Sequence, residues 1–503
     1  MQLPKSLEAI QKLLAKKKIT CEQLVLDYLQ QIEATKHLNA YVEIFADEAV
    51  ACAKNLDARY AKDPETVGKL FGAVVSIKDV ICYEGHQVTA ASKILEGFHS
   101  LFSATAVERL LAEDAIIIGR TNCDQFAMGS DNTNSVYGPV RNAADDARVA
   151  GGSSGGAAVS VQTNSCLIAL GSDTGGSVRQ PAAFCNVFGL KPTYGRISRY
   201  GLLAYGSSFD QIGIFAHNVA DISLMLDIIA GADEFDATCS TQTCDTFKGI
   251  SDNGQWTMDN GKKKDNDFLS SIVHRPSSGV QKKYKIAYLK SSVESEAIEQ
   301  AIRGKMLETI SNLEKSGHTT AAIEFDLLDY IIPAYYVLTT AEASSNLSRF
   351  DGVRYGHRAE NTKSLDEMYK KTRTEGFSEE VKRRIMLGSF VLSAGYYDAY
   401  YTKAQKVRRL LSDRINEIFA QYDFILMPAS PIAPWKIGEK NDDPVAMYLL
   451  DIFTVLANMV GIPGIAVPMG FDENNLPIGL QFLSAKWKED ELLKFVSGFE
   501  TGN

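Results

Sequence analysis

Two glycine-rich turns, each presenting a serine, place the strongest constraint on how this chain can fold. The first covers residues 151–156 and reads Gly-Gly-Ser-Ser-Gly-Gly; the second covers residues 171–177 and reads Gly-Ser-Asp-Thr-Gly-Gly-Ser. Glycine has no Cβ, so it lets the backbone bend sharply and come close to a ligand. If the apolar segment between the turns folds back, Ser153 and Ser177 meet in one pocket.

The same composition also occurs in structures without a reactive serine. Gly/Ser-rich stretches form flexible linkers, and glycine turns at helix starts bind anions. A linker is disfavoured because apolar segments continue on both sides without a change in composition. A phosphate-binding P-loop is disfavoured because no Gly-Lys-Ser/Thr follows at the required spacing. Each turn alone remains weak evidence for a nucleophile.

A serine nucleophile needs a base, and no histidine lies between His99 and His217. Lysine replaces histidine in Ser-Lys variants of the catalytic triad. The candidate is Lys78, in an apolar, β-branched run that is typical of a buried strand. Lys78 is either a strand-end residue whose amine reaches solvent or a buried base. Adjacent strand residues point to opposite faces, so Asp79 need not pair with it, and we expect Lys78 to be buried without a carboxylate partner.

The overall composition limits the class of protein and its surroundings. The chain of 503 residues is 45% hydrophobic, which is ordinary for a soluble globular protein. Its net charge of −10 argues against a broad basic surface for nucleic acid. Eight cysteines without a C-x-x-C pair are typical of free thiols in a reducing compartment, so we expect no metal site and a cytoplasmic location. We find no signal or transit peptide and no apolar run long enough for a membrane.

Strand-like apolar runs alternate with helical patterns along the chain. Strands are expected within residues 71–80 and at residues 115–119, 167–170, 284–289, 424–427, 464–467 and 478–482, and one long helix at residues 292–316. This alternation predicts an α/β fold, with a sheet that is covered by helices on both faces. We divide the chain into N-terminal helices (1–65), a core (66–230), a polar surface insertion (240–283) and the remainder (284–503).

Lys78, Ser153 and Ser177 together resemble the amidase signature family, whose catalytic group is a Ser-Ser-Lys triad. The family's motifs follow in order from Phe71 to Asp221, and a looser resemblance covers nearly the whole chain. The resemblance implies one large α/β domain whose mixed central β-sheet is covered by helices on both faces. It implies that Ser177 is the nucleophile. It also implies that Ser153, after a cis peptide, bridges Ser177 to the base Lys78.

Residues 122–130 resemble the family's motif at the substrate pocket, with Gln125 in place of the usual glutamate. The second turn leads into a helix, so Ser177 is expected near a helix N-terminus. Backbone N–H groups that are free there could form an oxyanion hole for a tetrahedral intermediate. The candidate donors are Thr174, Gly175 and Gly176. Arg179 is expected to lock this turn rather than to touch substrate.

Within the family, the part after residue 330 is most similar to glutamine-hydrolysing subunits of tRNA-dependent amidotransferases. By this resemblance, Tyr335, Arg384 and Asp451 bind glutamine. Arginine pairs bidentately with an α-carboxylate, and aspartate accepts hydrogen bonds from an α-ammonium. Without the resemblance, the local pattern places Arg384 on a solvated helix face.

The resemblance also implies a setting for the reaction. The chain would join two other subunits, B and C, in a heterotrimer and pass ammonia to the partner that amidates glutamate on tRNA(Gln). ATP and Mg²⁺ would act in that partner, which would also hold most of the tRNA, and this chain would need no cofactor. Two alternatives stay open: a stand-alone amidase acting on another small amide, and a catalytically silent scaffold.

Overall fold

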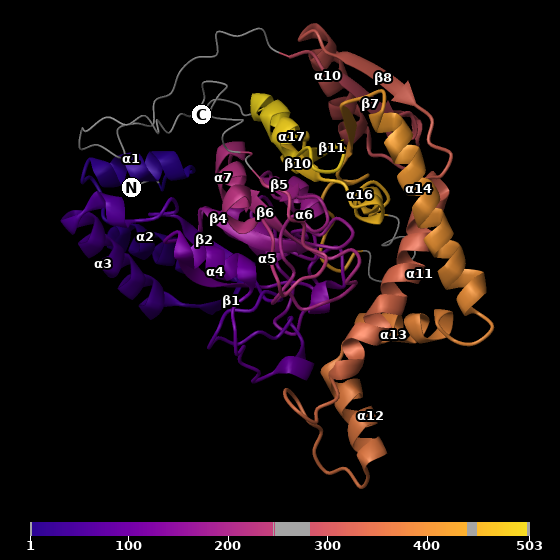
Figure 1. Ribbon diagram of the computed structural model, residues 1–503, viewed down its shortest axis with the longest axis horizontal. Coiled ribbons are helices and arrows are strands. Elements are labelled where there is room, and N and C mark those ends of the chain that lie inside the picture. Colours follow the sequence, from indigo (N-terminus) through magenta and orange to yellow (C-terminus); the bar gives the residue numbers. More distant parts are fainter. Residues whose placement is uncertain (1–2, 245, 247–281, 440–449, 500–503) are drawn as a thin grey trace.

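A mixed eleven-stranded sheet runs through the part of the chain that the computed structural model describes, residues 3–244, 246, 282–439 and 450–499 (Figure 1). From edge to edge the strands are β1 (Tyr41–Ile44), β3 (Ile116–Thr121), β2 (Val74–Lys78), β4 (Ile168–Asp173), β6 (Gln211–Ala216), β5 (Phe188–Lys191), β10 (Gly464–Phe471), β11 (Pro477–Ser484), β9 (Phe424–Pro428), β7 (Lys285–Leu289) and β8 (Thr319–Ile323). The pairs β2–β3, β2–β4, β7–β8 and β7–β9 are parallel, and the other pairs are antiparallel. The expected α/β fold is confirmed.

The central strands are short apolar runs because both of their faces are covered. Every residue of β2, β3, β4, β5, β6, β9 and β11 is buried. Strands of this kind need helices on both sides of the sheet. The helices α4 (Thr105–Ala112), α5 (Gly155–Gln162), α6 (Arg179–Phe184), α7 (Val219–Ile229) and α17 (Glu489–Val496) supply much of this cover.

Three N-terminal helices, α1 (Leu7–Ala15), α2 (Cys21–Ala34) and α3 (Ala46–Lys62), lie at one end of the molecule (Figure 1). Ser6 accepts a hydrogen bond from the N–H of Ala9, and Thr20 accepts one from Gln23. These side-chain caps satisfy N–H groups that have no partner within the helix, and therefore fix where α1 and α2 begin.

Four further helices lie at the opposite end: α11 (Leu328–Asn346), α12 (Leu365–Gly376), α13 (Glu379–Val391) and α14 (Lys403–Phe419) (Figure 1). The short helix α16 (Val455–Val460) packs against α11 and α14. A second buried apolar cluster joins α11, α14 and α16 to β7 and β9. The described chain also has short helical turns: η1 (Lys36–Leu38), η2 (Pro64–Thr66), η3 (Lys93–Leu95), η4 (Gln125–Ala127), η6 (Leu347–Arg349), η7 (Tyr397–Thr402) and η8 (Ser497–Phe499).

The prediction of a single helix at residues 292–316 is wrong. The structure has a short α9 (Ser291–Glu294) and then α10 (Gln300–Lys315). Ser295 is extended, with ψ 132°, and the N–H of Glu299 donates to the carbonyl of Pro431 instead of to a preceding turn. A tertiary contact thus interrupts a sequence pattern that is locally helical.

The predicted insertion at residues 240–283 lies largely outside the described residues, and the four-part division of the chain stays a prediction. None of the helices described above combines the length and the apolar character that a membrane crossing requires.

Candidate active site

The two glycine-serine turns lie against each other at the carboxyl ends of the inner strands β2 and β4. β2 and β4 are parallel neighbours, so the ends that carry Lys78 and Asp173 lie on the same side. The first turn leads into α5 and the second leads from β4 into α6. The N–H of Ser154 donates to the carbonyl of Ser177 over 3.2 Å, which joins the turns directly. The expected meeting of the two turns is confirmed.

Lys78 is fully buried and is surrounded by hydroxyl groups. Its Nζ lies 2.7 Å from Oγ of Ser153, 2.9 Å from Oγ of Ser154 and 2.9 Å from Oγ of Ser172. Among the described residues no carboxylate pairs with this amine; Asp79 instead accepts hydrogen bonds from its own loop. Burial therefore lowers the pKa of Lys78 to about 8. The expectation of a buried lysine without an acidic partner is confirmed.

The neutral form of the amine matches these three partners. The Ser154 hydroxyl donates to the Ser172 carbonyl over 3.0 Å, so toward Lys78 it acts as an acceptor. A neutral amine can donate to Ser154 and Ser172 and still direct its lone pair at Ser153. Sequence reasoning missed Ser154 and Ser172, although both stand inside the two turns. Their hydroxyls orient the amine toward the bridging serine.

Ser177 stands at the edge of this group rather than inside it. Its side chain is 8% exposed, whereas Ser153 is fully buried. Neither Ser153 nor any other described residue forms a hydrogen bond with the Ser177 hydroxyl. The Gly152–Ser153 peptide bond is cis, as the resemblance implies. Of Lys78, Ser153 and Ser177, only Ser177 is thus open to a ligand.

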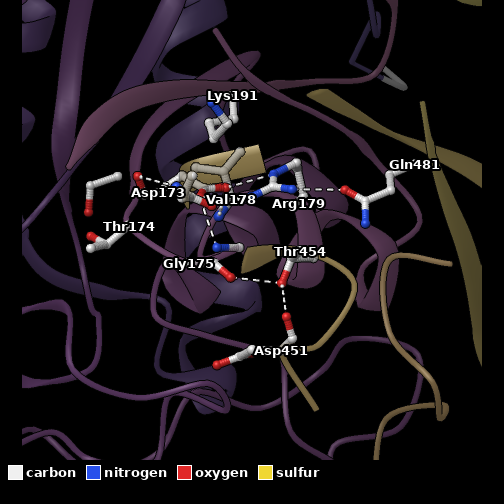
Figure 2. A network of polar contacts seen from close by, with 12 residues as sticks. Asp173, Thr174, Gly175, Val178, Arg179, Lys191, Asp451, Thr454 and Gln481 are labelled. Carbon is white, nitrogen blue, oxygen red and sulfur yellow. Dashed lines mark hydrogen bonds and ion pairs between the residues drawn. The ribbon is translucent and has the colours of Figure 1, made fainter. Parts of the chain in front are cut away.

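A buried ion pair holds the second turn (Figure 2). Asp173 accepts a hydrogen bond from the N–H of Gly176 over 2.8 Å and pairs with Arg179 over 3.1 Å. Arg179 also donates to Oε1 of Gln481 and to Oδ1 of Asn458. Burial alone would raise the pKa of Asp173, but the charge and hydrogen bonds of Arg179, together with the Lys191 charge and the Asn458 hydrogen bond, outweigh burial and lower the pKa to about 2. Arg179 locks the turn, as expected.

The expected oxyanion hole needs one correction. The N–H of Gly176 is committed to Asp173, so the expectation that it is free is wrong. The N–H groups of Thr174 and Gly175 find no acceptor among the described residues. The Gly175 carbonyl accepts from the Thr454 hydroxyl over 2.7 Å, which fixes the orientation of this part of the turn (Figure 2).

Asp451 lies beside the same turn and is buried. It accepts a hydrogen bond from the Ser130 hydroxyl over 2.8 Å, and its own carbonyl accepts one from Thr454 (Figure 2). The Tyr336 hydroxyl also reaches it, at 3.5 Å. Burial raises the pKa of Asp451 to about 7, although the Ser130 hydrogen bond opposes this rise. Sequence reasoning missed the role of Ser130, which belongs to the motif at residues 122–130.

Arg384 is buried, so the prediction from its local sequence, that it lies on a solvated helix face, is wrong. Its guanidinium donates to the Tyr205 hydroxyl over 2.7 Å and forms an ion pair with Glu380 over 2.8 Å. It also lies over the ring of Tyr336, 5.4 Å from the centroid. Because Tyr336 contacts both Arg384 and Asp451, the two charged groups flank one ring. The spacing of Glu380 and Arg384 on one helix is a signal that sequence reasoning left unused.

Tyr335 completes the set and lies against the second turn. A Cβ atom on Gly175 would overlap the Tyr335 hydroxyl, so the close approach requires glycine at this position. Tyr335 thus packs on the turn that presents Ser177, and the neighbouring Tyr336 ring contacts both a cation, Arg384, and an anion, Asp451. A cation and an anion placed this way can bind the two charged groups of an amino acid.

Comparisons with known proteins agree with this geometry. The pattern that describes the amidase family matches residues 23–493. The A subunit of glutamyl-tRNA(Gln) amidotransferase from Chlorobaculum parvum is 47% identical over 97% of this chain and 95% of its own length. The protein of the same name from Prosthecochloris aestuarii is 48% identical over 98% of both chains.

Two solved structures share the fold. The crystal structure of the A subunit of glutamyl-tRNA(Gln) amidotransferase from Thermotoga maritima superposes with a TM-score of 0.73, at 37% identity over 94% of this chain and 90% of that one. A peptide amidase from Stenotrophomonas maltophilia superposes with a TM-score of 0.78, at 25% identity over 98% of this chain and 96% of that one.

Proposed function

The chain belongs to the amidase family, and we propose that it is the glutamine-hydrolysing subunit of a glutamyl-tRNA(Gln) amidotransferase. The relatives that carry this name match it over nearly the full length. One observation carries the proposal: a buried amine, held by hydroxyls alone, lies next to a serine turn on which Tyr335 packs, and the neighbouring Tyr336 contacts both Arg384 and Asp451. Glutamine offers an amide to the serine and two charged groups to the pair.

The reaction begins at the Ser177 hydroxyl, which attacks the side-chain amide carbon of glutamine. Ser153 takes the proton from Ser177 and passes its own to the neutral amine of Lys78. The N–H groups of Thr174 and Gly175 stabilise the oxyanion, at roughly 3 kcal/mol for each well-placed donor. The proton returns through Ser153 to the leaving nitrogen, and ammonia departs. Water then attacks the glutamyl ester, releases glutamate and restores Ser177.

Three residues select glutamine among amides. The Arg384 guanidinium binds the α-carboxylate and the Asp451 carboxylate binds the α-ammonium. Tyr335 closes the pocket against the second turn. Asp451 must be ionised to act, and a bound ammonium favours that form because an opposite charge lowers the pKa of a carboxyl group.

The ammonia serves a second reaction on another protein of the complex. We propose that this chain joins subunits B and C in a heterotrimer, in which a partner uses ATP and Mg²⁺ to amidate glutamate on tRNA(Gln). This chain then needs no cofactor, and its net charge of −10 fits a complex in which a partner holds most of the tRNA. We place the complex in the cytoplasm, where tRNA is charged.

A glutaminase assay on the purified chain, with and without subunits B and C, tests the proposal. We expect ammonia release from glutamine, and loss of glutamine affinity on Arg384→Ala or Asp451→Ala. Hydrolysis of simple amides but not of glutamine, with no effect of either substitution, would instead identify a stand-alone amidase. Absence of hydrolysis together with no labelling of Ser177 by a fluorophosphonate would leave the scaffold alternative.

A further inference from the structure

Gln125 connects the loop after β3 to the beginning of α13. Its side chain is 2% exposed, and its Oε1 accepts a hydrogen bond of 2.7 Å from the backbone N–H of Ser378. Ser378 is the residue that caps α13, because its hydroxyl accepts from the N–H of Val381. This hydrogen bond, which Gln125 accepts, therefore fixes the capping residue just before the helix, in addition to the helix's own hydrogen bonds.

α13 carries the cation of the glutamine pocket. Arg384 lies six residues beyond Ser378, about 9 Å along the helix axis at 1.5 Å per residue. Glu380, which pairs with Arg384, lies in the first turn of the same helix. A shift of the helix start therefore moves the guanidinium and its ion-pair partner together.

The loop that holds Gln125 is itself tied to the catalytic turn. The N–H of Asp124 donates to the Ser153 carbonyl over 3.1 Å, and the Asp124 carboxylate accepts from the N–H groups of Asn132 and Asn134. Ser130, in the same loop, donates to Asp451. One loop thus contacts the bridging serine, the anion of the pocket and the helix that bears the cation.

We propose that Gln125 is a positioning residue that sets the place of Arg384 relative to the triad, and through it the affinity for glutamine. The inference rests on the proposed function, because it assigns Arg384 to the α-carboxylate of glutamine. Only an acceptor oxygen is needed from this side chain, so glutamate at this position serves the same purpose. Alanine removes the oxygen and releases the start of α13.

The Ser378 N–H can be removed as well as its acceptor. Ser378 has φ −67°, which proline adopts, and Phe377 before it is extended, as a residue before proline must be. Ser378→Pro deletes the N–H, and also the capping hydroxyl. Ser378→Ala deletes only the hydroxyl and is the matched control. Glu379→Ala is a second control, because this side chain is exposed in the same turn.

The test compares glutamine kinetics of these variants in the complex with subunits B and C. We expect Gln125→Ala and Ser378→Pro each to raise KM for glutamine about five- to tenfold, the effect of one lost neutral hydrogen bond. We expect kcat within about twofold of wild type, because the triad keeps its own contacts. Gln125→Glu and Glu379→Ala should keep the wild-type KM, and Ser378→Ala, which loses the cap but keeps the N–H, should raise KM less than Ser378→Pro does. The double variant of Gln125→Ala and Ser378→Pro should be no worse than either alone, since both remove the same bond.

An inhibitor separates positioning of Arg384 from a general structural effect. The compound 4-aminobutyramide is glutamine without its α-carboxylate, so its inhibition constant should be unchanged in every variant. An equal rise in that constant and in KM would overturn the inference, as would additive effects in the double variant. A wild-type complex that hydrolyses no glutamine would overturn the proposed function itself, and the inference with it.

Discussion

Lys78 gives the proposed reaction a pH dependence that can be measured. Burial lowers its pKa from 10.5 to about 8, a change of about 3 kcal/mol in favour of the free amine. At pH 7 roughly one enzyme molecule in ten then holds the free amine, against roughly one in 3,000 for an unperturbed lysine. Because only the free amine accepts the proton, kcat should rise tenfold per pH unit until about pH 8 and then level off.

A second group titrates in the free enzyme. Burial raises the pKa of Asp451 to about 7, and only its ionised form binds an α-ammonium. The kcat/KM profile reports the free enzyme, so its logarithm should have a slope of two below pH 7 and of one between pH 7 and 8. The kcat profile reports the glutamine complex, in which Asp451 stays ionised, so it should have one break, near pH 8.

The assay is ammonia release at low and at saturating glutamine from pH 5.5 to 9. Asp451→Asn should lose the lower break in kcat/KM. Lys78→Arg keeps the charge but holds its proton across this range, so it should lower kcat by about 10⁴ or more. A kcat that is flat from pH 6 to 9, or a Lys78→Arg variant with the wild-type rate, would refute the reasoning.

The second turn supplies the remaining tests. Ser177→Ala should abolish both hydrolysis and fluorophosphonate labelling while leaving the calorimetric Kd for glutamine within about threefold, because the charged groups that bind glutamine lie elsewhere. Asp173→Asn leaves the buried Arg179 charge uncompensated and should lower the free energy of unfolding in urea by about 3–5 kcal/mol. In the wild type, the folded pKa of about 2 for Asp173 against 3.8 unfolded contributes about 2 kcal/mol above pH 4, and urea titrations should show its loss as the pH falls toward 2. Gly175→Ala should lower kcat at least about tenfold through its clash with Tyr335, and adding Tyr335→Phe should restore part of it.

The parts of the site that rest on local patterns could be predicted from the sequence. Lys78 ends an apolar strand, and glycine turns present Ser153 and Ser177, so their types and neighbours already indicate their roles. The same holds for Arg179, whose place just after the turn predicts that it locks it. Each of these residues is fixed mainly by the segment in which it stands.

Other features depend on segments that are distant in the sequence. Arg384 is buried because Tyr205, far away along the chain, covers it. The pattern of polar and apolar residues around Arg384 cannot indicate such a distant contact. Gly176 loses its free N–H to Asp173 because the turn closes on itself, which composition does not reveal. The break between α9 and α10 arises from the partner that Glu299 finds at Pro431.

The contacts of Arg179 determine the order in which the parts of the site can form during synthesis of the chain. Its guanidinium reaches Asn458 on α16 and Gln481 on β11, near the end of the chain. A nascent polypeptide on the ribosome displays the serines and the lysine long before these two acceptors have emerged. The turn that presents the nucleophile therefore gains these two contacts only after residue 481 has been translated.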